Sequence, residues 1–437
     1  MKKSLIIVII CWLTVALRAQ TEVFTDSLSL VGNASERYDS VYCADSLPYP
    51  ENLRHRLDGL LQSPLLQRTQ LGLMVFDLTA DSCIYRFQER QTLRPASTMK
   101  LLTAITAIDQ LGGNYQLRTR LSYTGTIANG TLNGTLWCVG GMDPMFDSDD
   151  LAAFVGSLRR LGVDTIRGRI VADRSFKEPE LLGEGWCWDD DNPVLSPLLL
   201  NRKDDFLMEF VQVLRNDGVV ADVLIGEDTA PATATSVCVR SHSIDQVLMK
   251  MMKDSDNLFA ESMFFQVAAA EGQRPARASH ARNAVKRMIQ KVGLAPSNYK
   301  IADGSGLSLY NYVSAELETR LLRYAWRNPE IYKYLGPVLP IAGVDGTLKN
   351  RMLKTNAAGN VMAKTGTLTA ISSLAGYCTA ANGHQLAFCI INQGVLRNQD
   401  GRDFQDQVCQ ALVNPDVPKA PEVPETPPAP RKKKKKR

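Results

Sequence analysis

Three short groups of polar residues have the types and the spacing that a serine-dependent acyl-transfer site requires. In the first group, Ser97 and Lys100 are three positions apart at the start of an apolar run that continues without a charge to Asp109. A helix would place both side chains on one face, within hydrogen-bond reach of each other. A buried ammonium is costly unless it is paired or its pKa is lowered, and a neutral amine can accept a proton. Ser97 and Lys100 are therefore a candidate nucleophile and general base.

The other two groups follow later in the chain. Ser255 and Asn257 occupy a turn-forming stretch between two expected helices, and Lys364-Thr365-Gly366 lies on an expected strand. Patterns as short as Ser-x-x-Lys and Ser-x-Asn each occur by chance about once in a chain of this length. Their order and context are more informative, because the same three groups in the same order mark serine enzymes that form an acyl intermediate.

The elements that must position these groups follow from the hydrophobic periodicity. Helical and strand patterns occur on both sides of a long turn-rich stretch, which predicts the α+β class. A buried helix entered at Ser97 carries the nucleophile, and a capping box at Ser243 opens the helix that precedes Ser255. The other expected helices are 51–62, 149–161, 258–271, 279–292, 315–327 and 403–413, and the expected strands include 71–78, 83–87, 165–172, 360–369, 372–379 and 385–391.

Changes in composition divide the chain into domains and terminal segments. Residues 1–20 have the basic start and apolar core of a secretory signal peptide, with a cut expected after Ala19; retention as an anchor is the alternative. Segments 21–113 and 241–416 are expected to form one catalytic domain. Residues 114–240 alternate polar and β-branched residues between turn signals, which predicts an inserted β-rich domain. The Pro-rich and polybasic segment 417–437 is expected to be a disordered tail.

The composition argues against several classes of function. With 45% hydrophobic and 22% charged residues the chain is globular. Its formal net charge of +4 comes from the basic run that begins at Arg431 and ends at Arg437, so the remainder is mildly acidic and does not support nucleic-acid binding. The nine cysteines and four histidines show no metal-ligand spacing, so we expect neither a metal nor a cofactor. The scarcity of histidine also disfavours a Ser-His-Asp triad.

Two cysteines test the expected register of the last two strands. A two-residue turn at Asn382-Gly383 would place Cys378 opposite Ala387 and make Cys389 its diagonal neighbour on the same face. Diagonal neighbours are usually too far apart for a disulfide. We therefore expect two free thiols in the core.

With four further segments, these groups resemble the low-molecular-mass, class C penicillin-binding proteins of the D-alanyl-D-alanine carboxypeptidase/endopeptidase type. The segments are 302–308, 339–348, Asp143-Pro144 and 186–190. The resemblance covers roughly 50–413. It implies an α/β sandwich of the serine β-lactamase/transpeptidase type, with the β-rich domain inserted after the nucleophile helix. The sequence departs from the family pattern at Leu309, where an arginine is usual.

The resemblance also implies catalytic roles. Ser97 would attack the carbonyl carbon between two D-alanines, and Lys100 would accept its proton. Ser255 would pass a proton to the leaving amine, and Asn257 would hold the peptide amide. The backbone N–H groups of Ser97 and Thr367 would bind the oxyanion.

For substrate binding, the resemblance points to the strand that follows Lys364. Lys364 would supply positive charge, and the hydroxyls of Thr365 and Thr367 would receive the terminal carboxylate, beside Gly366 and Thr369. Asp173 would face a substrate ammonium. From its position at the end of an expected strand, Asp173 can equally be a cap.

The implied partners are peptidoglycan stem peptides and β-lactams as covalent inhibitors, in an exported, periplasmic protein. A serine β-lactamase is an alternative, but it typically carries a glutamate in an E-x-x-L-N loop, and Glu316 and Glu318 lie in a helical run without that asparagine. A non-catalytic wall-binding module is another alternative, although it would lose motif residues that are all present here. The basic tail is either a solvated end or a tether to an anionic membrane surface.

Overall fold

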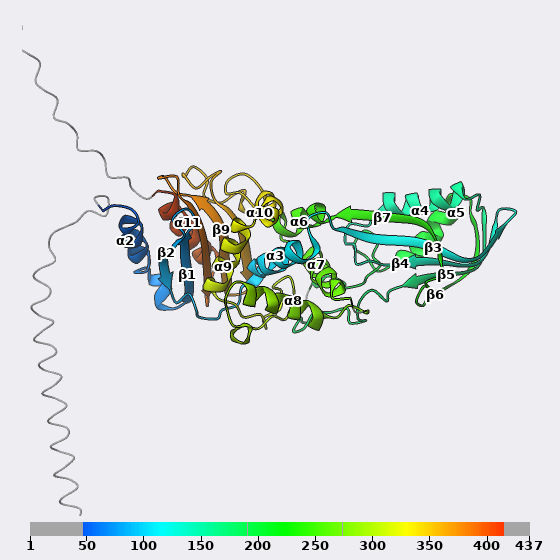
Figure 1. Cartoon of the computed structure of the whole chain (residues 1–437), viewed down its shortest axis with the longest axis horizontal. Helices are drawn as coiled ribbons and strands as arrows, with labels where there is room; N and C mark the ends of the chain where they lie inside the picture. Colours follow the sequence, from blue (N-terminus) through cyan, green and yellow to red (C-terminus); the bar gives the residue numbers. More distant parts are fainter. Residues whose placement is uncertain (1–46, 190, 273, 415–437) are drawn as a thin grey trace, which may run out of the picture. The chain divides into compact units, whose positions relative to one another are not determined.

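A computed structural model describes residues 47–189, 191–272 and 274–414 (Figure 1). Residues Leu53–Pro415 form one compact unit that contains two five-stranded sheets. In the other unit, Met1–Asn52 with Asp416–Arg437, the described residues are 47–52, which include the start of α2 (Glu51–Leu60). The expected signal peptide and polybasic tail lie outside the described residues. Among the described residues, no helix combines the length and apolarity needed to cross a bilayer.

The first sheet joins the beginning and the end of the compact unit. All neighbouring strands in it are antiparallel. Its order is β2 (Ser82–Phe87), β1 (Gln70–Asp77), β10 (Gln385–Gln393), β9 (Ile371–Thr379) and β8 (Met362–Leu368). The strand that contains the Lys-Thr-Gly triplet is therefore an edge strand, and on its outer side an isolated bridge pairs its first residue, Met362, with Ile341.

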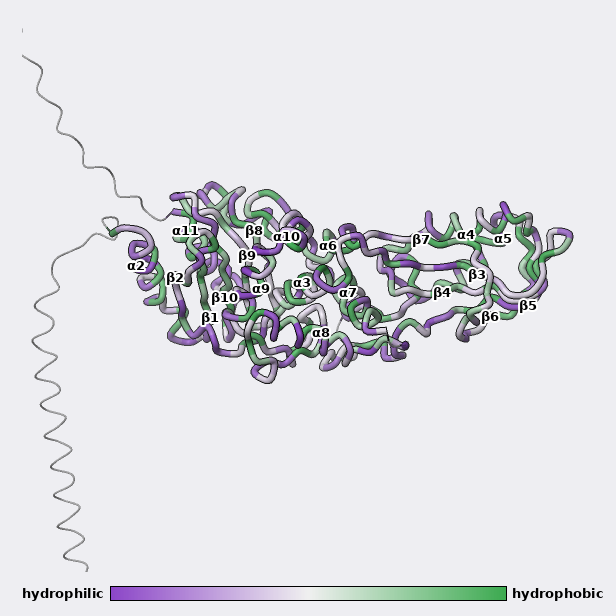
Figure 2. Tube along the Cα trace, viewed as in Figure 1, coloured by the Kyte–Doolittle hydropathy of each residue, from purple (hydrophilic) through white to green (hydrophobic). Residues whose placement is uncertain are grey.

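Helices cover both faces of this sheet. On one face, α9 (Ala315–Arg327) packs against β1, β9 and β10. On the other face, α11 (Asn398–Val413) packs against β9 and β10, and Gln405 donates to Ser372 Oγ at 3.0 Å. Because both faces are covered, β9 and β10 are almost continuously buried, and residues 386–391 of β10 are all apolar (Figure 2).

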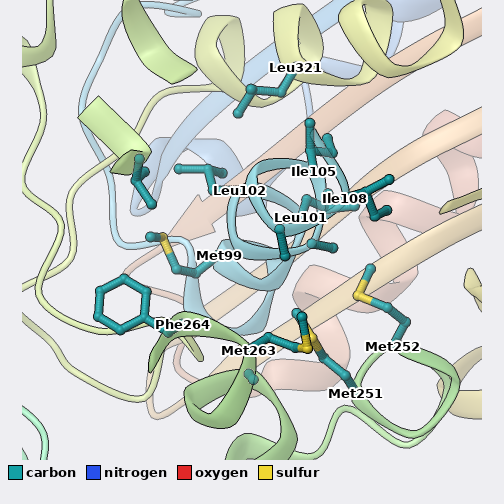
Figure 3. Close-up of a cluster of buried hydrophobic side chains, with 14 of the residues drawn as sticks. Met99, Leu101, Leu102, Ile105, Ile108, Met251, Met252, Met263, Phe264 and Leu321 are labelled. Atoms are coloured by element: carbon teal, nitrogen blue, oxygen red, sulfur yellow. The ribbon is translucent and has the colours of Figure 1, made fainter. Parts of the chain in front are cut away.

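The region around the candidate nucleophile is centred on α3 (Met99–Leu111), which is buried over ten consecutive residues. Its side chains pack against side chains of neighbouring helices, among them Met251, Met263 and Leu321 (Figure 3). These neighbours are α6 (Ile244–Lys253), α7 (Asn257–Ala270), α8 (Ala278–Lys291), α9 and α10 (Pro329–Leu335). A helix enclosed on all sides must be apolar all round, and this explains why one lysine in α3 was conspicuous in the sequence.

The second sheet consists of residues between β3 and β7. Its order is β6 (Val220–Glu227), β5 (Thr165–Asp173), β4 (Thr131–Val139), β3 (Gln116–Ala128) and β7 (Thr235–Ser243). The pairs β4–β5 and β5–β6 are parallel, and β3 is antiparallel to both of its neighbours. Two helices, α4 (Ser148–Arg160) and α5 (Phe206–Asn216), pack on it and enclose a separate core. The domain boundaries at 113/114 and 240/241 stay a prediction.

The α+β class is confirmed, and several elements match the expected ones closely. The expected helix 315–327 is α9, and the capping box at Ser243 forms with Gln246 as its partner. The closing helix begins five residues earlier than the sequence suggested.

The hairpin between β9 and β10 corrects one expectation. Its loop contains three residues, 381–383, instead of two. Cys378 therefore lies opposite Leu386, and the predicted pairing with Ala387 is wrong. A shift of one residue reverses the face, so Cys389 points to the other side of the sheet. Both cysteines are buried free thiols, as expected.

Candidate active site

The candidate nucleophile lies on a short 3₁₀ turn, Ala96–Thr98, which leads directly into α3. Lys100 Nζ lies 3.0 Å from Ser97 Oγ, as the three-residue spacing predicted. Ala96 has a φ of 50°, a conformation that is strained for any residue other than glycine. This turn holds the serine hydroxyl at the lysine while the lysine side chain is fully buried.

The Lys-Thr-Gly strand packs directly against this turn. A Cβ atom at Gly366 would lie 2.6 Å from Pro95 O and 3.0 Å from Ser97 N, closer than real Cβ contacts allow. Only glycine therefore permits β8 to approach the nucleophile's backbone. The sequence placed Gly366 at the substrate, and the structure adds this packing reason for it.

The second group provides a hydrogen-bond acceptor for each of the two lysines. Asn257 Oδ1 accepts from Lys100 Nζ at 2.7 Å, and Ser255 Oγ accepts from Lys364 Nζ at 2.8 Å. Ser255 has a φ of 62°. Strain of this kind persists only where the surroundings enforce it, and it is concentrated at functional sites. Three hydrogen bonds thus join the five residues expected to be catalytic into two groups, Ser97–Lys100–Asn257 and Ser255–Lys364, and the charge of Lys100 acts on Lys364.

Asp256, between Ser255 and Asn257, fixes the turn between α6 and α7. Asp256 caps α7 by accepting from the backbone N–H of Phe259, and it forms an ion pair with Arg202. Arg202 lies in the segment between β5 and α5, so part of the region expected to be inserted contacts the second group directly.

A buried loop supplies a third acceptor for Lys100. The carbonyl of Ser305 accepts from Lys100 Nζ at 2.8 Å. The loop is held by Glu261 on α7, whose carboxylate accepts from the backbone N–H groups of Gly304 at 3.0 Å and Ser305 at 2.7 Å. Asp303 holds its other end and also accepts from the Trp186 indole at 2.8 Å. Glu261 was not among the site residues predicted from the sequence.

Burial shapes the proton affinities of this cluster. Burial lowers the pKa of Lys100 to about 8, although the carboxylates of Asp303, Glu261 and Asp256 act in the opposite direction. Burial, followed by the charge of Asp303, raises the pKa of Glu261 to about 8. Burial and the nearby Lys100 hold the pKa of Lys364 well below its usual range. With a pKa of about 8, Lys100 is neutral in about one-tenth of molecules at pH 7, and this fraction can act as a base.

A second carboxyl group lies behind the nucleophile turn. Glu318 on α9 is fully buried, and its Oε1 lies 2.7 Å from the Thr98 hydroxyl. Its other oxygen accepts from Cys389 Sγ at 3.2 Å. Burial raises the pKa of Glu318 to about 7. Glu318 thus supports Thr98, the residue that follows Ser97.

The expected carboxylate-binding residues lie along β8 and the turn after it. The Thr365 hydroxyl donates to Thr347 Oγ1 at 2.7 Å, and Thr347 belongs to the segment 339–348 that carried part of the resemblance. Thr367 is exposed on β8, and Thr369 is exposed in the turn between β8 and β9. Their roles in binding stay predictions.

Two other expectations concern charged contacts. Asp173 ends β5, and both of its carboxylate oxygens accept from backbone N–H groups, those of Ser175 at 2.9 Å and Ala230 at 3.0 Å. This geometry fits the strand-end cap, and a contact with a substrate ammonium stays a prediction. At the position where the family usually has arginine, the carbonyl of Leu309 accepts from Arg94 Nε at 2.9 Å, which brings another guanidinium to this place.

Comparison with known proteins gives consistent results. The family described as D-Ala-D-Ala carboxypeptidase 3 (S13) matches residues 53–198 and 198–414. D-alanyl-D-alanine carboxypeptidase DacB of Haemophilus influenzae is 26% identical over 413 residues, covering 75% of this chain and 86% of the relative. The D-alanyl-D-alanine carboxypeptidase of Actinomadura sp. is 27% identical over 442 residues, covering 78% and 81%.

A solved structure extends the similarity to three dimensions. The crystal structure of penicillin binding protein 4 from Haemophilus influenzae matches with a TM-score of 0.74 at 25% identity, over 82% of this chain and 98% of that chain. Its complex with a β-lactam matches with a TM-score of 0.70 at 26% identity, with the same coverage.

Proposed function

Because the chain belongs to the D-Ala-D-Ala carboxypeptidase 3 (S13) family, we propose that it cleaves peptidoglycan stem peptides through an acyl-enzyme on Ser97. The protein is a serine-type D-Ala-D-Ala carboxypeptidase of the penicillin-binding kind. The observation that carries the assignment of Ser97 is its hydroxyl, 3.0 Å from the fully buried amine of Lys100.

Acylation begins at Ser97. Neutral Lys100 takes the hydroxyl proton as Ser97 Oγ bonds to the carbonyl carbon between the two D-alanines. The backbone N–H groups of Ser97 and Thr367 stabilise the oxyanion. The peptide bond then breaks, and the proton held by Lys100 is delivered to the leaving D-alanine amine through the Ser255 hydroxyl, which receives one proton as it gives one. Lys100 is neutral again, and the acyl group remains on Ser97. Water attacks this ester and releases the shortened peptide.

Substrate binding uses the edge strand. The peptide lies along β8, with Asn257 holding its amide and the terminal carboxylate facing Lys364, Thr365 and Thr367. An arriving carboxylate stabilises the protonated form of Lys364, whose pKa is low in the free site. Lys364 then binds as a cation while Lys100 stays the base.

The β-lactam complex of the Haemophilus influenzae protein supports the same chemistry with β-lactams. A β-lactam would acylate Ser97 as a substrate does. A serine β-lactamase is less well supported, because the two candidate glutamates are occupied: Glu316 bonds to Arg320, and Glu318 lies against Thr98 and Cys389.

The substrate is tested with purified muropeptides. We expect the full chain to release D-alanine from monomeric pentapeptides and, as an endopeptidase, to split D-centre cross-links, whereas Ser97→Ala does neither. Nitrocefin turnover as fast as D-alanine release would instead favour the β-lactamase. Absence of both products in an enzyme that binds penicillin would contradict the proposed substrate.

We also propose export by residues 1–20 and reversible attachment of the polybasic tail to anionic lipid. Seven basic residues at roughly 1 kcal/mol each suffice for peripheral binding, and salt should weaken it steeply. Co-sedimentation with anionic vesicles compares the full chain with a chain truncated after Asp416. Equal pelleting of the two at low salt would leave the tail as a solvated end.

A further inference from the structure

A cavity of about 810 Å³ lies away from the nucleophile and is lined by three arginines. Arg118 and Arg120 come from β3, and Arg274 comes from the segment between α7 and α8. Other lining residues are Leu111, Tyr115, Phe176 and Gln266. We call it the arginine cavity. Leu111 ends α3, and Ser97 lies just before its start, so a rise of ~1.5 Å per residue separates the two places by about 20 Å.

The charges of Arg118 and Arg120 are not compensated locally. Arg118 and Arg120 are two positions apart on β3, so their exposed side chains lie on one face of the strand. Their cross-strand neighbours are neutral: Ser241 for Arg118, and Val139 and Val239 for Arg120. Within the described part of the chain, no carboxylate lines the cavity or bonds to either guanidinium.

The inner wall of the cavity is polar and fixed. Tyr115 donates its hydroxyl to Gln266 Oε1 at 2.7 Å, and Gln266 Nε2 donates to the carbonyl of Gly141 at 2.6 Å. Arg274 stacks over the Phe176 ring at 4.5 Å from its centroid. The charges of Arg118 and Arg274 both reach Tyr115, where they lower the pKa of its hydroxyl against the larger effect of burial. The guanidinium charges therefore act on the same space.

A second arginine-rich cavity provides the contrast. This cavity of about 660 Å³ beside α9 is lined by Arg320, Arg323 and Arg327, but also by Asp81 and Glu316. Each of these three guanidiniums pairs with one of the two carboxylates. The other two basic side chains of this cavity are also bonded, Lys291 to Asp109 and Arg86 to the Cys83 sulfur, whereas Arg118 and Arg120 have no carboxylate partner among the described residues.

We propose that the arginine cavity is a second, non-catalytic binding site for the carboxylate groups of a peptidoglycan stem peptide. Guanidinium groups bind carboxylates in bidentate fashion, and the cavity volume suits a ligand of peptide size. The inference rests on the proposed function, which brings wall peptides to the protein. About six extended residues would span the distance to Ser97, so a neighbouring stem of the same wall strand can occupy the cavity during catalysis.

The test uses full-length protein whose Ser97 has been acylated with penicillin, so that the catalytic site is blocked. The probe is the synthetic tripeptide L-Ala-γ-D-Glu-meso-diaminopimelate, which lacks both D-alanines, titrated by calorimetry. The cavity variant is Arg118→Gln/Arg120→Gln. The matched control is Arg167→Gln/Arg169→Gln, which removes the same charge from exposed positions on β5 of the same sheet. Melting temperature and penicillin labelling verify the folding of both.

We expect saturable binding, at least a tenfold weaker Kd in the cavity variant and a change within twofold in the control. No saturable binding to the acylated parent, or equal losses in the two variants, would overturn the second site. Competition by inorganic phosphate as strong as that by the tripeptide would overturn the assignment to peptide carboxylates. D-alanine release by the unblocked enzyme, measured in parallel, distinguishes failure of this inference from failure of the proposed function.

Discussion

The surroundings of Ser97 and the core of the second sheet are built on opposite principles. Around Ser97 the protein buries five ionisable side chains that are each at most 1% exposed: Lys100, Glu261, Asp303, Glu318 and Lys364. The second sheet instead encloses four phenylalanines in mutual contact, Phe146, Phe154, Phe206 and Phe210. Its buried Asp143 and Asp150 are bonded to His242 and Arg240.

The difference indicates which region lowers the free energy of unfolding and which region raises it. Burying a charge costs several kcal/mol unless geometry compensates, whereas burying aromatic rings stabilises the fold. Changes near Ser97 should therefore alter rates and pH dependence, and changes in the second core should alter the free energy of unfolding. Each prediction below tests that division.

The largest effect is expected for Lys100→Ala. Loss of the positioned base should slow acylation by penicillin by a factor of about 10² or more. The measurement is the second-order rate constant of acylation. A control is Lys177→Met, which removes another buried lysine that bonds to the Glu180 carbonyl away from Ser97, and it should stay within about threefold. A loss below tenfold for Lys100→Ala would indicate another base.

The second sheet gives the complementary prediction. Phe154→Ala removes a fully buried ring from the aromatic cluster and should lower the free energy of unfolding by about 3–5 kcal/mol. The acylation rate of the folded fraction should be unchanged. Denaturant titration measures the free energy of unfolding, and penicillin labelling measures the acylation rate. A large loss of acylation rate in fully folded Phe154→Ala would show that the second core also affects the chemistry at Ser97.

Glu318 predicts a pH effect on stability. Its pKa is about 7 in the folded protein and near 4.5 when exposed, so folding is favoured by the retained proton below pH 4.5. This contribution is lost as the pH rises to about 7, and it amounts to an order of 3 kcal/mol. Glu318→Gln should flatten that decline in denaturant titrations from pH 4 to 8. If the free energy of unfolding of Glu318→Gln declines with pH as steeply as that of the parent, groups other than Glu318 cause the decline.

The smallest effect is a shift of the pH profile. Acylation should rise with pH around 8 as Lys100 loses its proton. Glu261→Gln removes a carboxylate that favours protonated Lys100, so the rise should move to lower pH by about one unit or less. The amide oxygen of glutamine can still accept the N–H groups of Gly304 and Ser305, which both bond to Oε1 of Glu261, so the loop should keep its position. A shift to higher pH would contradict this placement of Glu261.

The sequence predicted the parts of the site whose residues are close together in the chain. Ser97 with Lys100 and Ser255 with Asn257 are local patterns, and Lys364 follows from its triplet. Glu261 could not be recognised, because its partners Gly304 and Ser305 come more than forty positions later. The sequence signal for Glu261 is its charge, because it is the one charged residue in the sequence of the buried helix α7.

The fold was likewise predictable where the pattern is local in the sequence. Hydrophobic periodicity located α9 and the strands of the first sheet, but the loop at 381–383 differs from the expected turn by one residue and so reverses Cys389. Helix α5 and the parallel pairing of β5 with β6 were not predicted, because parallel neighbours are distant in the chain.

The central claim is that Ser97 is the nucleophile, and covalent labelling with penicillin tests it most directly. Digestion and mass spectrometry of the labelled full chain should find one acylated residue per molecule, in the peptide that contains Ser97. Ser97→Ala should take up no label while keeping its melting temperature. A label on that variant, or on a different peptide of the parent protein, would contradict the account.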